Sequence, residues 1–134
     1  MRSLTDKQRA DWLQLIRTES IGPITFHRLI AKFGAADVAL ARLPETANAR
    51  RKSPIRIASR TRVEEEIARA AEAGARFIAS CEAAYPRKLA AIPDPPPVIC
   101  IRGHASLFER SAVAIVGARN ASAAGRRFAR TLAA

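Results

Sequence analysis

The chain has 134 residues, of which 49% are hydrophobic, so it can bury the core of one ordinary domain or two small ones and wholesale disorder is excluded. Its 23 lysines and arginines outnumber the 12 acidic residues and give a formal charge of +11, which favours a polyanion such as nucleic acid as partner. A general arginine bias of the source proteome is the alternative explanation for this charge.

The first residues lack the apolar core of a signal peptide, and no apolar run approaches the length needed to span a membrane. The two cysteines, Cys81 and Cys100, have no metal-binding spacing and no histidine cluster nearby. We therefore expect a cytoplasmic protein with free, buried thiols, without a metal site and without a cofactor.

Amphipathic helices are predicted at the start of the chain. Thr5 and Gln8 have the spacing of a capping box, and the helix that follows is expected to end near Arg17. A further short helix is expected over residues 36–43, because Pro44 should stop it.

A second helix is predicted between the turn Gly22-Pro23 and Gly34. Its apolar stripe consists of Phe26, Leu29, Ile30 and Phe33. The pattern resembles the hairpins of helix-hairpin-helix and SAM-like domains, in which the glycine turn can present backbone N–H groups to a DNA phosphate. The alternative is a purely structural hairpin, and His27 between the core positions is expected to be a packing or surface residue.

Residues 44–60 have little periodicity and many arginines, and indicate a linker with one short helix around 54–59. A second capping box at Thr61 predicts a helix that ends at Gly74. We therefore divide the chain into a helical domain with a basic linker, residues 1–60, and the beginning of an α/β domain, residues 61–134.

Two buried strands are expected in the α/β part, at residues 76–79 and 98–101. Between them lie a helical turn at 84–89 and a proline-rich extended connector at 92–97. A short turn of helix is expected at 106–108.

The most informative stretch comes next. Residues 113–116 form a β-branched apolar run, typical of a buried strand of a parallel sheet, and a helix is predicted from Ala123. A tight turn between them would place free helix N–H groups and the fork of Arg119 beside a phosphate. Ser122 is either the N-cap of the helix or another phosphate donor, and the alternative role of Gly117 is only to supply a backbone angle that other residues avoid.

The turn has neither a G-x-G-x-x-G nor a P-loop pattern, so a dinucleotide or a nucleoside triphosphate is not the favoured ligand. For Arg119, the alternative to a phosphate is an ion pair with a carboxylate such as Asp94. The candidate DNA or phosphate contacts are Gly117, Arg119, Asn120, Ser122, Gly125 and Arg126.

Four ordered motifs resemble the DNA-processing protein A family (DprA, also called Smf). They are Tyr85-Pro86-x-x-Leu89, Ile92-x-Asp94-x-Pro96, Val98-Ile99-x-Ile101-x-Gly103, and Val113-Ala114-Ile115-Val116-Gly117-Ala118-Arg119 with Gly125. The hairpin at Gly22–Gly34 is similar to the SAM-like domain that many members carry. Ala118 and Ala124 depart from the serine and tyrosine that are common in the family.

The resemblance implies a SAM-like helical domain followed by an extended Rossmann-like domain. It also implies a protein that binds single-stranded DNA without sequence preference in natural transformation, protects incoming strands and helps to load the RecA recombinase. In the family, further strands and the dimer surface lie beyond the position of residue 134, so we expect a homodimer formed through that part of a longer protein.

No Ser/His/Asp or Cys/His set is arranged for nucleophilic catalysis, and no paired carboxylates stand out, so we expect a binding protein and not an enzyme. The alternative is a nucleotide-binding enzyme, because the fold around the turn also resembles that of phosphoribohydrolases. A third possibility is that residues 1–74 serve only as a protein-interaction module.

Overall fold

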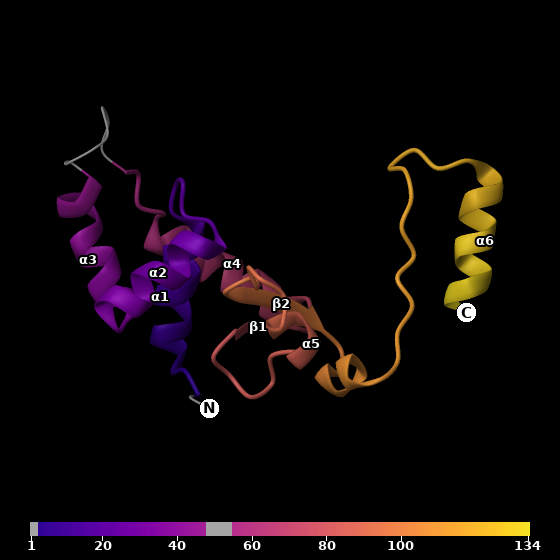
Figure 1. Cartoon of the computed structure of the whole chain (residues 1–134), viewed down its shortest axis with the longest axis horizontal. Coiled ribbons are helices and arrows are strands. Elements are labelled where there is room, and N and C mark those ends of the chain that lie inside the picture. Colours follow the sequence, from indigo (N-terminus) through magenta and orange to yellow (C-terminus); the bar gives the residue numbers. More distant parts are fainter. Residues whose placement is uncertain (1–2, 48–54) are drawn as a thin grey trace.

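The computed structural model describes residues 3–47 and 55–134. Its N-terminal half is helical, with α1 (Asp6–Arg17), α2 (Pro23–Phe33) and α3 (Ala36–Ala47) packed together and α4 (Arg60–Glu72) beside them. A small sheet follows, and the chain then extends away from it to a last helix (Figure 1).

The predicted ends of the first two helices are confirmed. The Thr5 side chain accepts the Gln8 N–H at 3.2 Å, and the Gln8 side chain accepts the Thr5 N–H at 2.9 Å, which completes the capping box. Pro23 is the first residue of α2, and Gly34 ends the helix with a φ of 79°, a left-handed conformation that glycine adopts without strain.

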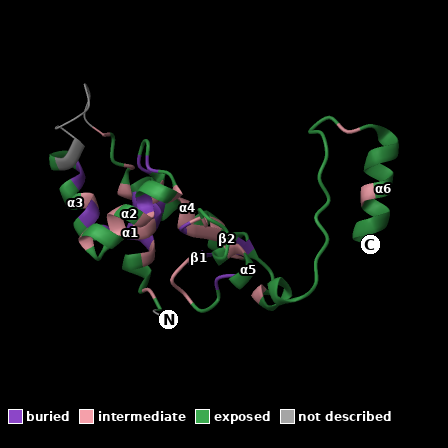
Figure 2. Ribbon diagram, in the orientation of Figure 1, coloured by how far each residue is buried: buried purple, intermediate pink, exposed green. Residues whose placement is uncertain are grey.

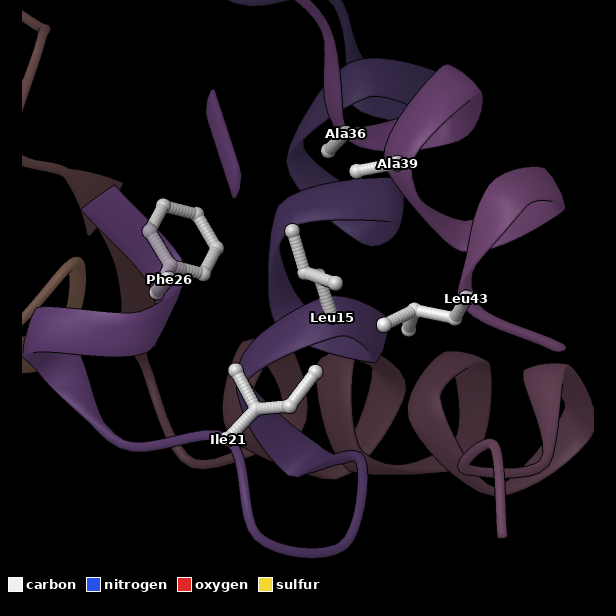
Figure 3. Packing of buried hydrophobic residues seen from close by; sticks show 6 residues of the cluster. All are labelled: Leu15, Ile21, Phe26, Ala36, Ala39 and Leu43. Carbon is white, nitrogen blue, oxygen red and sulfur yellow. The ribbon is translucent and has the colours of Figure 1, made fainter. Parts of the chain in front are cut away.

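The helical core lies between α1, α2 and α3 (Figure 3). Phe26 is fully buried, and its ring meets Trp12 edge-on with 4.9 Å between the ring centroids. The remaining buried members of the cluster are Leu15, Ile21, Ala36, Ala39 and Leu43. The predicted stripe of α2 is confirmed, with Leu29, Ile30 and Phe33 partly buried against this core.

The predicted end of the third helix at residue 43 is wrong, because α3 continues through Pro44 to Ala47. Leu43 is buried in the helical core, and the Arg42 guanidinium donates to Glu45 at 2.9 Å across the proline. Burial of Leu43 favours the helical conformation at this point, although proline cannot donate the hydrogen bond of a helix interior.

The predicted cap at Thr61 is also wrong. The N-cap of α4 is Ser59, whose Oγ accepts the Arg62 N–H at 3.4 Å, so Thr61 lies inside the first turn. The earlier start places Arg60 on the helix, where it contacts the buried Asp11 of α1. Residues 55–59 form no helix, and Pro54 lies outside the described residues.

The sheet has two strands, β1 (Ala75–Ala79) and β2 (Val98–Arg102), which pair antiparallel with Phe77 opposite Cys100. Phe77 packs with Leu13 of α1 and Val63 of α4. The other face of the sheet carries Ile78, Tyr85 and Ile101, with Leu89 of α5 (Arg87–Ala90) against them. The positions of both strands and of the intervening helical turn are confirmed, but the predicted burial of β2 and of the two thiols is wrong, because Cys100 is exposed on β2 and Cys81 is only partly buried.

The prediction of a buried strand at residues 113–116 is wrong. The segment is extended but belongs to no sheet, and Val113 and Val116 are 88% and 92% exposed (Figure 2). An apolar run becomes a buried strand only beside a hydrogen-bonding neighbour and under a covering layer. The rest of the described chain supplies neither to this segment. The short 3-10 helix η1 (Ala105–Glu109) and helix α6 (Ala123–Ala133) form as expected.

Candidate nucleic-acid interface

The segment from Arg110 to Ala134 is the longest stretch of the sequence without an acidic residue, and it is exposed almost throughout. It contains five arginines and no acidic residue, and Figures 1 and 2 show it as an extended arm that ends in α6. No carboxylate of the segment competes with a bound anion, so its arginines favour a phosphate backbone.

The turn before α6 is closed by Ser122. Its Oγ accepts the Gly125 N–H at 3.2 Å and its carbonyl accepts the Arg126 N–H at 3.0 Å, so its role as N-cap is confirmed. The N–H groups of Ala123 and Ala124 belong to the first turn and have no partner within the helix. The helix therefore presents free donors at its positive end, next to Arg119 and Asn120 in the sequence.

Arg119 is exposed, and among the residues that the structure describes it forms no ion pair, with Asp94 or with any other carboxylate. The ion pair with Asp94, which was the alternative to a phosphate contact, does not form. The guanidinium keeps all its donors for a ligand.

Gly117 adopts no left-handed φ, and a Cβ built on it would meet nothing within 4 Å. The interpretation that this glycine is needed for its backbone angle finds no support in the geometry. All six candidate contacts are exposed, and they fall within ten consecutive residues around one turn.

The helical hairpin offers a second set of backbone donors. Gly22 is the N-cap of α2 and has no side chain to accept from the first turn, and Pro23 has no N–H, so Ile24 and Thr25 present the free donors. His27, half-buried, lies 3.0 Å from the Pro95 carbonyl through its Nε2 atom and so joins α2 to the proline-rich connector. This contact agrees with the packing role expected for His27.

Sequence reasoning missed the electrostatic centre that joins the helices to the sheet. The Glu82 carboxylate accepts from Arg9 at 2.7 Å, from the Ala79 N–H at 2.8 Å and from the Leu4 N–H at 3.3 Å. Burial alone would raise the pKa of Glu82, but these hydrogen bonds and the charge of Arg9 outweigh it and hold the pKa below its usual value. Arg9 and Glu82 are 73 residues apart, so no local pattern could have paired them.

Within residues 3–47 and 55–134, no group of three or more His, Cys, Asp or Glu side chains is arranged to hold a metal ion. None of the helices in these ranges is long and apolar enough to cross a membrane.

Two family models together match almost all of the chain. The DprA-like N-terminal HHH domain matches residues 6–84, and the DNA recombination-mediator protein A family matches residues 76–134. No curated protein matches the chain. The two matches indicate a DNA-processing mediator of recombination. The chain belongs to the DprA/Smf family, and no catalytic family is indicated.

Proposed function

We propose that this protein binds single-stranded DNA without sequence preference, through the turn at residues 117–126 and the arginines around it. The observation that carries the proposal is the exposed, acid-free segment from Arg110 to Ala134, within the match to the recombination-mediator family. Positive charge and backbone donors are what a non-specific strand binder needs.

The family role supports a wider proposal. The protein acts in natural transformation, where it protects incoming strands and helps to load RecA, and it works in the cytoplasm as a homodimer. Residues 61–134 are the beginning of an extended Rossmann-like domain, and the two antiparallel strands are compatible with such a start. Pull-down of RecA on DNA-coated beads, with and without this protein, tests the loading role.

The central test is the variant Arg119→Ala. We expect it to weaken binding of a single-stranded oligonucleotide by about 1.5–3 kcal/mol, the range for hydrogen bonds to charged groups. It should also reduce the slope of log affinity against log salt by about 0.7, the value for one phosphate contact on a single strand. Its thermal stability should equal that of the wild type, because Arg119 has no partner in the described chain.

The matched control is Arg28→Ala on α2, an exposed arginine without an ion pair among the described residues. It removes the same charge from a different surface and should leave the salt slope nearly unchanged. Equal losses in both variants would mean that only net charge matters, and tighter binding of duplex than of single strands would contradict the proposal.

A further inference from the structure

A cleft of about 550 Å³ lies on the helical part of the molecule, between the end of α1 and the outer side of α4. Three arginines line it, Arg17 from α1 and Arg62 and Arg69 from α4. Two glutamates, Glu65 and Glu66, line it as well. The cleft is far along the sequence from the turn at Arg119.

The three arginines are not equivalent. Arg17 is held in place by Glu66, with its Nε 3.1 Å from one carboxylate oxygen and its Nη2 2.7 Å from the other. This two-pronged contact leaves the Nη1 group of Arg17 for another acceptor. Glu66 is therefore neutralised, and it orients a guanidinium at the cleft.

Arg62 and Arg69 form no ion pair with any residue that the structure describes. They are seven residues apart on α4, which is two helical turns or about 10 Å along the axis. They lie on the same side of the helix, with Glu66 between them at the (i, i+4) position from Arg62. Two free guanidinium groups thus lie at the two ends of one cleft.

The three arginines and two glutamates give the cleft a net charge of +1. Of the two glutamates, Glu66 is paired with Arg17, and Glu65 forms no ion pair with a described residue. Planar guanidinium groups match phosphate oxygens better than they match any other common anion except carboxylate. The charge of +11 over the whole chain attracts a polyanion to this side of the molecule too.

We propose that this cleft, which we call the arginine cleft, is a second contact surface for the phosphates of single-stranded DNA. The inference rests on the proposed function, since it requires that the chain binds a single strand. It assigns a DNA-binding role to the end of α1 and the side of α4, in addition to any backbone contact at Gly22. The segment before α4 adjoins that hairpin, because the Glu19 N–H donates to the Arg56 carbonyl at 3.3 Å.

The test compares three proteins on oligothymidylates of increasing length by fluorescence anisotropy at several salt concentrations. The first carries R62Q and R69Q together, where glutamine keeps the helix propensity. The matched control carries R28Q and R102Q, which remove two exposed arginines outside the cleft. The third is Glu65→Gln, which removes the unpaired carboxylate of the cleft. Circular dichroism melts establish that all three fold.

We expect R62Q/R69Q to weaken binding of long strands about tenfold and to lower the salt slope by about 1.4, twice the value for one phosphate. Short strands that occupy only the turn at Arg119 should lose little. Glu65→Gln should strengthen binding severalfold, an effect that a merely structural role of the cleft would not produce. The control should keep the wild-type slope.

Failure of the arginine cleft can be distinguished from failure of the proposed site at Arg119. Equal affinity and slope in R62Q/R69Q and in the control would overturn the arginine cleft and leave the Arg119 site intact. An effect of R62Q/R69Q without an effect of Arg119→Ala would support the cleft and overturn the turn at Arg119. A wild-type chain that binds no single strand would overturn both.

Discussion

The helical core and the C-terminal arm contain the same kinds of apolar residue and use them in opposite ways. Phe26 on α2 is fully buried, whereas Phe128 on α6 is 67% exposed. Both lie on the apolar side of an amphipathic helix. The difference is that α2 packs against α1 and α3, whereas α6 lies apart from the other helices of the described chain (Figure 1). An amphipathic pattern shows which face of a helix favours burial, but the face is buried only where another element packs against it.

The sharpest way to break this comparison is to truncate both phenylalanines. Phe26→Ala should lower the free energy of unfolding by about 3–5 kcal/mol, because it leaves a cavity between α1, α2 and α3. Phe128→Ala should change it by less than about 0.5 kcal/mol. Urea unfolding followed by circular dichroism measures both, and a loss on Phe128→Ala near that of Phe26→Ala would show that α6 is packed in solution.

The second prediction concerns the joint between the helices and the sheet. Glu82→Gln should cost about 2 kcal/mol, since it removes the charge that Arg9 and two backbone N–H groups stabilise. The pKa of Glu82 is lowered in the folded state. The stability that this carboxylate contributes is therefore present above its unfolded pKa of about 4.5 and is lost as the pH falls through the lower folded pKa.

Melting temperatures between pH 7 and pH 3 test this. The loss of stability towards acid should be smaller in Glu82→Gln than in the wild type. The matched control is Glu45→Gln, an exposed carboxylate paired with Arg42, which should behave as the wild type. An unchanged acid profile in Glu82→Gln would mean that the hydrogen bonds at Glu82 contribute nothing to folding.

The smallest effect is expected from a pair of glycines. Gly34 has a φ of 79°, so Gly34→Ala should cost about 1 kcal/mol through the strain of a left-handed residue. Gly117 has no such φ and open space around its Cα, so Gly117→Ala should leave stability unchanged. Thermal melts of the two variants test both expectations. A destabilised Gly117→Ala would indicate that neighbouring atoms pack against this residue in solution.

The sequence by itself determined those features that depend on neighbours along the chain. The capping box at Thr5 needs only a residue three positions away, and Gly34 ends a helix by its own backbone freedom, whereas the sequence left Ser122 open between N-cap and phosphate donor. The same holds for the family, because its motifs are short and ordered along the chain. The division at residue 60 stays a prediction, and the six contacts around Arg119 stay proposals.

Only the tertiary structure decided what depends on distant residues. Ser59 replaced Thr61 as the cap of α4, and α3 ran through Pro44, where packing of Leu43 outweighs the local rule. The Arg9–Glu82 contact, the antiparallel register of β1 with β2 and the arginine cleft each join segments far apart in sequence. The run at 113–116 is exposed for the same reason, since an apolar pattern states a preference for burial but only a neighbouring strand can satisfy it.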